Sequence, residues 1–448
     1  MTRKDITVSP KKRQRHLHYH LWNIGCQMNR ADAYRIGEAL ERRGYLPTQD
    51  PEEADLILLN TCVVRQSAED KVIGRLSSLR PLKEDQKERA LLVMGCFVGD
   101  ADTLAARYPF VDAFFLPSAI HEVIQFAEEW GMACGKDVSP KRDPLTRPHV
   151  ADFVPISYGC NHHCTYCIVT LRRGQQRSRP IAEIRTDVEN LIRRGTRDVT
   201  LLGQNVDAYG SDLPQQQDLA DVFEAIHDIE DLWRIRFLTS HPADMTQRII
   251  DAVAAYPKVC PCWELAVQSG DDEILRRMGR GYTVEEFRPL VQRIREATPD
   301  CAINTDVIVG FPGETREQFE NTLRLIQEMR FDMVHVAAYS PRPGTPAAAW
   351  EDDVPTAEKE RRRAHIEKVQ EEIAEEINTL FLDQNVEILV DGKQRGRWRG
   401  RTRTHKLVFF ASDENWLGRM AHVHITWAGP WSMVGHVVTD QPHATPCS

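Results

Sequence analysis

Three cysteines within eight residues have the clearest chemical potential in this sequence. Cys160, Cys164 and Cys167 lie in the stretch Cys-Asn-His-His-Cys-Thr-Tyr-Cys. Thiolates bind zinc and iron–sulfur clusters, and a closed site of either kind takes four protein ligands. A [4Fe–4S] cluster held by three cysteines keeps one iron open for a ligand that the protein does not supply. The alternative is a zinc site that takes His162 or His163 as its fourth ligand.

A second set of three cysteines follows three extended apolar runs near the start of the chain. Each run ends in one of them: Cys26, Cys62 and Cys96. Helical patterns separate the runs, and this alternation predicts a parallel sheet whose ligand site forms at the carboxyl ends of its strands. A lone buried cysteine is usually a small apolar side chain. Three at equivalent strand ends predict a second three-cysteine cluster in one crevice, where Gly25 and Gly95 allow tight turns.

The spacing Cys-x3-Cys-x2-Cys, with the aromatic Tyr166 before the last cysteine, resembles the signature of radical S-adenosylmethionine (SAM) enzymes. In that superfamily the open iron binds the amino and carboxylate groups of SAM. An electron from the cluster then cleaves the sulfonium and yields a 5′-deoxyadenosyl radical. The resemblance implies that the protein orients this cofactor chemistry and excludes water from it.

Strands and helices alternate from about residue 152 to 340, which predicts a parallel sheet curled into a partial (β/α)6 barrel. The expected strands are 152–158, 197–203, 233–239, 262–268, 302–309 and 332–339. The expected helices are 181–194, 218–229, 244–256, 284–297 and 315–328. Residues that follow the strands share one rim, where such folds carry function. The candidates at this rim are Gly203, Gln204, Asn205, His241, Gln268 and Gly310.

The whole chain is therefore predicted to be an α/β protein with three folded parts. We expect a basic tail (1–15), an N-terminal domain (16–132), a linker (133–151), a radical SAM core with a connector helix (152–378), a small β-barrel (379–440) and a tail (441–448). The N-terminal helices are expected at 29–44, 66–80 and 118–130. The charged run 353–378 reads as a solvated connector helix. The remaining cysteines considered, Cys134, Cys260, Cys262 and Cys301, are assigned no metal.

Composition indicates a cytoplasmic protein. The chain has 448 residues, of which 42% are hydrophobic, enough for ordinary cores. No apolar run approaches the roughly 20 residues that cross a bilayer, and no apolar segment follows the basic N-terminus, so neither a membrane span nor a secretory signal is expected. Eleven cysteines in such a chain favour metal binding in a reducing compartment over disulfides. We expect a monomer.

A basic stretch near the C-terminus contrasts with the net charge of −9. Strands expected at 386–391, 396–402, 407–411, 420–427 and 432–438 predict a small antiparallel β-barrel. Alternation along a strand places five arginines on one face, next to Trp398 and Lys406. This arginine ladder comprises Arg395, Arg397, Arg399, Arg401 and Arg403. It predicts an RNA-binding surface, and the alternative is a solvated face. A second basic group is Arg172, Arg173, Arg177 and Arg179.

Matching stretches over nearly all of residues 16–440 resemble the methylthiotransferase family of radical SAM enzymes, most closely its MiaB-type tRNA branch. They include Gly25-Cys-Gln-Met-Asn29, Asn60-Thr-Cys-Val-Val-Arg65, Arg177-Ser-Arg-Pro180, Leu202-Gly-Gln-Asn-Val206, Val267-Gln-Ser-Gly270, Asp306-Val-Ile-Val-Gly-Phe-Pro-Gly-Glu-Thr315 and Tyr339-Ser-Pro-Arg-Pro-Gly-Thr-Pro346. Residues 400–410 resemble the TRAM RNA-binding module. The sequence departs from the family pattern at Thr170, at Phe97-Val-Gly99, at Glu264 and at Ala266.

The resemblance implies an activity and its partners. Such enzymes place a methylthio group at C2 of N6-(dimethylallyl)adenosine, also called N6-isopentenyladenosine, at position 37 in the anticodon stem-loop of tRNA. One SAM methylates sulfur at the auxiliary cluster of Cys26, Cys62 and Cys96, and another SAM, at the Cys160 cluster, makes the radical. The residues that would contact SAM are Tyr166, Gly203, Gln204, Asn205, Gln268 and Gly310. An electron donor such as flavodoxin or ferredoxin and a sulfur donor are also implied.

Three alternative functions stay open at this point. The same chemistry could act on a ribosomal-protein aspartate, although that branch tends to differ at Gln204-Asn205 and at 342–344. It could act on threonylcarbamoyladenosine in tRNA, against which Asn205 and 340–343 argue. A non-catalytic RNA-binding protein with structural metal sites is the third, but it leaves two cysteine trios without a fourth ligand.

Overall fold

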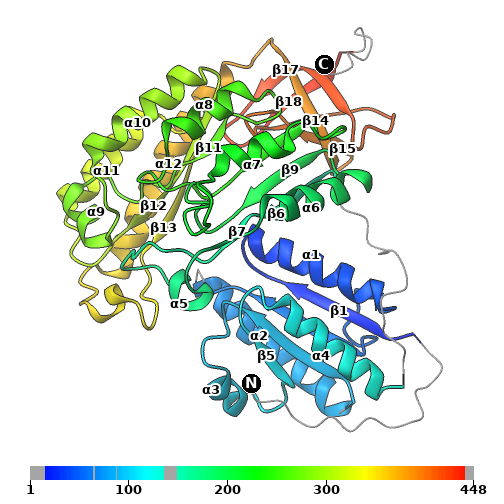
Figure 1. Ribbon diagram of the computed structural model, residues 1–448. Helices are drawn as coiled ribbons and strands as arrows, with labels where there is room; N and C mark the ends of the chain where they lie inside the picture. Colours follow the sequence, from blue (N-terminus) through cyan, green and yellow to red (C-terminus); the bar gives the residue numbers. More distant parts are fainter. Residues whose placement is uncertain (1–15, 64–65, 87, 136–148, 439–448) are drawn as a thin grey trace. The chain divides into compact units, whose positions relative to one another are not determined.

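The computed structural model describes residues 16–63, 66–86, 88–135 and 149–438 (Figure 1). The predicted tails and most of the predicted linker lie outside these described residues. Contacts divide the chain into two compact units. The first contains the N-terminal part up to residue 135 together with 168–175, and the second contains the remaining described residues from 149 onward. Each unit is described by itself.

The N-terminal unit is built on a five-stranded parallel sheet with the order β2-β1-β3-β4-β5. Its strands are β1 (His18–Asn23), β2 (Leu46–Pro47), β3 (Leu56–Thr61), β4 (Ala90–Gly95) and β5 (Ala113–Phe115). Its main helices are α1 (Gln27–Arg42), α2 (Gln66–Asp85), α3 (Ala101–Arg107) and α4 (Ile120–Ala133). The predicted parallel sheet is confirmed. Sequence reasoning missed β2, β5 and α3, which are too short to show a period.

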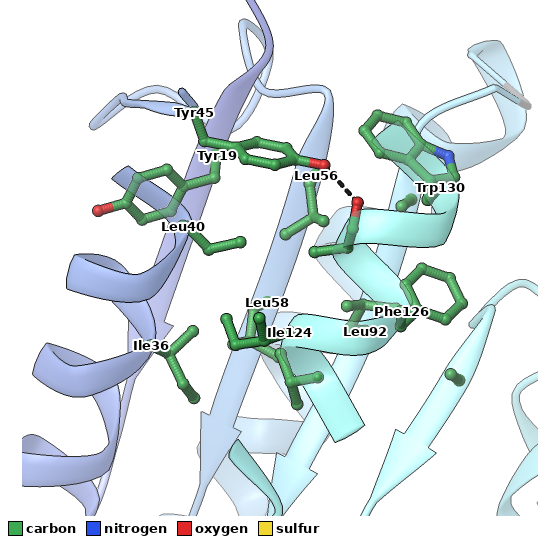
Figure 2. Close-up of a cluster of buried hydrophobic side chains, with 14 of the residues drawn as sticks. Tyr19, Ile36, Leu40, Tyr45, Leu56, Leu58, Leu92, Ile124, Phe126 and Trp130 are labelled. Carbon is green, nitrogen blue, oxygen red and sulfur yellow. Dashed lines mark hydrogen bonds between the residues drawn. The ribbon is translucent and has the colours of Figure 1, made fainter. Parts of the chain in front are cut away.

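Both faces of this sheet are buried, which explains why β3 and β4 are continuous apolar runs. Leu56 and Leu58 point into one core with α1 and α4, whereas Ile57 and Leu59 point into a second core with α2. Figure 2 shows the first core, where the buried Tyr45 hydroxyl donates a 2.6 Å hydrogen bond to the backbone oxygen of Ala127. Cys134 lies in this same core, in agreement with its predicted structural role.

Six parallel strands form the partial barrel of the second unit. They are β6 (Ala151–Pro155), β9 (Asp198–Leu202), β10 (Arg234–Phe237), β11 (Cys262–Glu264), β12 (Ala302–Val309) and β13 (Met333–Ala338). They form two three-stranded sheets, which isolated parallel bridges join between β10 and β11. Helices follow the strands: α6 (Ile181–Arg193), α7 (Leu219–Ile226), α8 (Gln247–Ala255), α9 (Asp272–Met278), α10 (Val284–Ala297) and α11 (Arg316–Met329). The predicted partial barrel is confirmed. Sequence reasoning missed α9, the short strand β8 (Arg177–Ser178) and the short 3-10 helix Pro346–Ala349.

Helix α12 (Thr356–Thr379) is not the solvated connector that its charge pattern predicted. One of its faces is buried, and Ile366 and Gln370 on this face are each at most 1% exposed. Arg362 on the same face binds Glu314 at 2.7 Å, and both side chains are almost fully buried. The prediction failed because long polar side chains can cover a core when each finds a partner.

The C-terminal part is a closed five-stranded barrel with the order β14-β15-β16-β18-β17. The predicted small barrel is confirmed, but the prediction that it is antiparallel is wrong for one pair, because β16 and β18 run parallel. Its strands are β14 (Asn385–Gln394), β15 (Arg397–Arg401), β16 (Leu407–Phe410), β17 (Met420–Ala428) and β18 (Met433–Val437). Trp398 and Gly400 point inward, and the arginines of β15 alternate with them. No helix within the described part of the chain is long and apolar enough to cross a membrane.

The small barrel is bound to the amino ends of the partial-barrel strands. Arg236 of β10, which is 5% exposed, donates to the backbone oxygens of Thr402 and Arg403 at 2.9 and 2.7 Å. Arg234 donates to the oxygen of Arg401. Because these guanidinium groups are buried, the loop after β15 supplies acceptors that they would otherwise lack. A domain boundary at residue 379 stays a prediction.

Candidate functional site

The three cysteines of the N-terminal unit lie at the carboxyl ends of the adjacent strands β1, β3 and β4. Cys26 caps α1, and Cys62 and Cys96 directly follow β3 and β4. A Cβ atom at Gly25 would lie 2.6 Å from Cβ of Cys62, and one at Gly95 would meet the backbone oxygen of Thr61 at 2.2 Å. Both glycines have positive φ angles, so their expected role in tight turns is confirmed. The structure brings these cysteines to one edge of the sheet.

Polar groups surround this edge. Asn29 is fully buried and links the strands, because its amide donates to the backbone oxygen of Thr61 at 2.8 Å and its Oδ1 lies 3.4 Å from Sγ of Cys26. Burial raises the pKa of the Cys96 thiol, and the guanidinium of Arg173 opposes that rise. Arg173 belongs to α5 (Val169–Arg173), which begins two residues after Cys167 and packs within the N-terminal unit.

The loop of Cys160, Cys164 and Cys167 belongs to the second unit, where its backbone is held at several points. Thr165 donates from its backbone and its hydroxyl to the backbone oxygens of Met278 and Arg277, at 3.0 and 2.8 Å. The three cysteines are partly exposed and form no disulfide. They are therefore available at the surface of the loop as ligands.

Arg280 is a site residue that sequence reasoning missed. It is 5% exposed and donates to Sγ of Cys164 at 3.4 Å and to the backbone oxygen of Ala266 at 2.7 Å. A buried cation beside a thiol favours the thiolate, which is the form that binds metal. Its only sequence signal was its place after the helix-ending Gly279.

A hydrogen-bond network ties the cysteine loop to the rim of the partial barrel. The Asp244 carboxylate pairs with Nε2 of His162 and accepts from the Asn205 amide, both at 2.5 Å. The His162 ring stacks on His241 with centroids 3.8 Å apart. Burial alone would raise the pKa of Asp244, but its two hydrogen bonds outweigh this effect and lower it. Burial, Arg280 and His162 lower the pKa of His241 to about 3.

This network bears on the alternative that the loop of Cys160, Cys164 and Cys167 is a zinc site with a histidine as its fourth ligand. Among the described residues, the only metal-ligand group with its atoms within 4.8 Å of one another is His162, His241 and Asp244. Stacked imidazoles direct their lone pairs side by side, and the Asp244 oxygen already binds two partners, so we interpret the group as a positioning network. Among the described residues, neither cysteine trio has its three sulfur atoms within 4.8 Å of one another.

The predicted rim residues follow their strands as expected. Gln204 accepts a 2.5 Å hydrogen bond from the backbone nitrogen of Gly159 next to the cysteine loop. Gln268 has a φ of 70°, and its Oε1 is buried with no hydrogen-bond partner among the described residues. Gly310 donates to Glu314 at 2.6 Å. Tyr166 packs edge-on against Phe311 with centroids 6.4 Å apart. Their contacts with SAM stay a prediction.

Glu264, where the sequence departs from the family pattern, belongs to a group of polar side chains on β11, β12 and β13. Asn304 donates to Oε2 of Glu264 at 3.2 Å, and Nε2 of His335 lies 3.8 Å from Oε1. Burial and the charge of Asp306 raise the pKa of Glu264 to about 8. Glu264 is therefore a carboxyl group that is largely protonated at neutral pH and can donate a hydrogen bond.

In the structure, some members of the arginine ladder bind other residues of the protein, and others are exposed to solvent. Arg399 pairs with Asp391 at 2.9 Å, and Arg403 donates to the backbone oxygen of Val259 at 2.9 Å. Lys406 pairs with Asp332 at 2.7 Å. Arg395 and Arg397 are exposed. In the second basic group, Arg173 is buried.

Comparison with known proteins places these features in a family. Residues 154–326 match the Radical SAM superfamily, and residues 18–115 match the uncharacterized protein family UPF0004. The chain is 48% identical to the tRNA-2-methylthio-N(6)-dimethylallyladenosine synthase of Roseiflexus sp. (strain RS-1), over 96% of this chain and 90% of that protein. It is 45% identical to the synthase of the same name from Herpetosiphon aurantiacus, over 94% and 98%.

The chain belongs to the family of tRNA-2-methylthio-N(6)-dimethylallyladenosine synthases. Among solved structures, the radical SAM methyltransferase TsrM from Kitasatospora setae is similar with a TM-score of 0.54 and 14% identity, over 74% of this chain and 75% of that one. At that identity the likeness concerns the fold alone. It agrees with the partial barrel described above.

Proposed function

We propose that this protein is a radical SAM enzyme that methylthiolates C2 of N6-(dimethylallyl)adenosine in tRNA. Its membership in the synthase family carries the proposal. The two cysteine trios support it, because each offers three thiols, one trio at an edge of the N-terminal sheet and the other on a loop, and each would leave one iron of a [4Fe–4S] cluster open. An aromatic C–H bond offers no acidic proton and no leaving group, so a radical generator and a sulfur source suit the reaction.

The residues of this chain have distinct roles in that reaction. Cys160, Cys164 and Cys167 would hold the cluster that binds SAM and supplies the radical. Cys26, Cys62 and Cys96 would hold the auxiliary cluster that carries the sulfur. Arg280 donates to the Cys164 sulfur, and Asp244 fixes His162 within the same loop.

Tyr166 and the rim residues would contact SAM beside this loop. The residues in question are Tyr166, Gly203, Gln204, Asn205, Gln268 and Gly310. Gln268 supports this role best, because its buried Oε1 lacks a partner that a ligand hydroxyl or amine could supply.

The tRNA, the reductant and the sulfur donor would come from outside the chain. The RNA surface would include the exposed Arg395 and Arg397. A small electron carrier of the flavodoxin or ferredoxin class would reduce the clusters. We propose a monomer that acts in the cytoplasm.

The decisive experiment is nucleoside mass spectrometry of tRNA from a strain that lacks the gene. We expect 2-methylthio-N6-(dimethylallyl)adenosine to disappear and N6-(dimethylallyl)adenosine to accumulate. Restoring the gene should restore the product, whereas a gene with Cys160→Ala should not. Loss of a methylthiolated threonylcarbamoyladenosine, or of a methylthio group on a ribosomal protein, would instead identify one of the alternative substrates.

A further inference from the structure

The N-terminal unit contains a buried cation, Arg173, whose carboxylate partner among the described residues, Asp32, lies 3.8 Å away. The Arg173 side chain is 4% exposed, yet its hydrogen-bond partners include the neutral Ser118 hydroxyl at 2.7 Å and the neutral Oδ1 of Asn29 at 3.4 Å. Asp32 is the carboxylate that faces it, at 3.8 Å, which is beyond a direct hydrogen bond. Asp32 is moreover bound by the Ser118 hydroxyl at 2.8 Å. A buried guanidinium in such surroundings is costly unless an anion binds it.

The remaining neighbours of Arg173 are the sulfurs of the auxiliary site. The guanidinium lies close enough to Cys96 to oppose the rise in the pKa of that thiol, and it interacts electrostatically with Cys26. Asn29, which approaches Cys26, also contacts Arg173. The cation therefore faces the place where three thiolates would converge.

We propose that Arg173 binds the anionic sulfur of the auxiliary centre and offsets its negative charge. A [4Fe–4S]²⁺ core with three thiolates carries one net negative charge, and a sulfide ligand on the open iron adds more. Guanidinium is a planar fork of donors that stays charged, so it can donate to Cys96 and to a hydrosulfide-class ligand together. This inference rests on the proposed function and adds the residue that holds the sulfur.

This role makes two predictions that simple anchoring of α5 does not make. A cation near a cluster stabilises its reduced form, because reduction adds a negative charge. Removing the cation should therefore shift the reduction potential of the auxiliary centre to more negative values. It should also weaken sulfide binding by about tenfold or more, since hydrogen bonds to charged groups have that magnitude.

The test uses full-length protein in which Cys160, Cys164 and Cys167 are replaced by alanine, so that only the auxiliary centre holds iron. Arg173→Gln, Arg173→Lys and the control Arg172→Gln are added to this background. Arg172 is the neighbouring arginine of the same helix, and its guanidinium lies against Gly99. Iron content, the midpoint potential from an EPR-monitored titration and the affinity for sodium sulfide are measured.

We expect Arg173→Gln to keep about four irons, to show a more negative potential and to bind sulfide about tenfold more weakly. Arg173→Lys should keep the potential near that of the background protein but still lose sulfide affinity, because an ammonium cannot reproduce the fork. Arg172→Gln should match the background protein in all three measurements.

Unchanged potential and sulfide affinity in an iron-loaded Arg173→Gln protein would overturn the proposal. If Arg173→Gln does not retain iron, the proposal is tested with Arg173→Lys instead. An unchanged sulfide affinity in Arg173→Lys would also overturn the proposal. A background protein that holds no cluster would instead show that Cys26, Cys62 and Cys96 are not the ligands. That result contradicts the proposed function and is distinct from a failure of Arg173.

Discussion

At the scale of single residues, the proposed chemistry depends on two sets of three thiols. Each set lacks a fourth protein ligand, so each cluster would present one iron to a small molecule. The protein adds a buried arginine beside a cysteine of each set, Arg173 beside Cys96 and Arg280 beside Cys164. Positive charge next to a thiolate cluster offsets charge that burial would otherwise penalise.

The assignment of the auxiliary ligands predicts the iron content. Two [4Fe–4S] clusters amount to about eight irons per chain after anaerobic reconstitution. Replacing Cys26, Cys62 and Cys96 by alanine should leave about four, abolish sulfur insertion and spare SAM cleavage. Replacing Cys160, Cys164 or Cys167 should instead abolish formation of 5′-deoxyadenosine. Iron analysis and chromatography measure these outcomes, and a triple variant with undiminished iron would show that the auxiliary ligands lie elsewhere.

Glu264 predicts a pH dependence of stability. Its pKa is about 8 in the folded protein and close to 4.5 when it is exposed. The folded state therefore binds the proton more tightly, and the free energy of unfolding falls as the pH rises from about 5 to 8. Glu264→Gln should remove up to about 4 kcal/mol of this fall. Denaturant unfolding at pH 5 and pH 8 measures it. If the free energy of unfolding changes equally with pH in the variant and in the parent, Glu264 is ionised over this whole pH range.

At the scale of elements, helix α12 stabilises the loop after β12 through one buried ion pair. Glu314 accepts hydrogen bonds from Arg362 and from the backbone of Gly310. Burial raises the pKa of Glu314, and the Gly310 nitrogen and Arg362 oppose that rise. This arrangement fixes a rim loop that is predicted to contact SAM.

Removal of Arg362 tests this arrangement. Arg362→Met would leave the Glu314 charge buried without its partner, so we expect a loss of about 3–5 kcal/mol in the free energy of unfolding. Adding Glu314→Gln should recover part of this loss. The control is Arg363→Met on the same helix, whose exposed pairs with Glu360 and Glu367 contribute less than about 1 kcal/mol. Equal losses in the free energy of unfolding for Arg362→Met and Arg363→Met would show that the buried ion pair stabilises the protein no more than the exposed ones.

At the scale of the whole molecule, a chain with a net charge of −9 would have to bind the proposed tRNA substrate through local basic surface. The structure limits which members of the arginine ladder can serve. Arg403 and Lys406 bind the partial barrel, and Arg399 pairs with Asp391. Arg395 and Arg397 are exposed and lie at the turn between β14 and β15.

Two double variants separate binding from stability. Arg395→Gln with Arg397→Gln should weaken tRNA binding and reduce the slope of log affinity against log salt by up to about two units, with Tm unchanged. Arg403→Gln with Lys406→Gln should lower Tm, because both contacts join the small barrel to the partial barrel. Binding titrations at several salt concentrations and thermal unfolding distinguish the two. If the first pair leaves the salt slope unaltered, the ladder is a solvated face.

The sequence alone determined the two cysteine trios, the α/β architecture and the closed C-terminal barrel. These features are local: three ligands within eight residues, apolar runs that alternate with helical periods, and short strands between turns. Such patterns follow from backbone geometry and from covalent spacing, so they can be read without knowledge of distant contacts.

Only the tertiary structure decided what surrounds these features. It placed Arg173 beside Cys96, although the two are far apart in sequence, and it buried one face of α12 that charge alone would have left in water. It also showed that Arg403, which belongs to the predicted RNA surface, donates a hydrogen bond to the backbone oxygen of Val259. A charged side chain carries the same local signal whether it is solvated or buried, because burial depends on partners that only folding supplies.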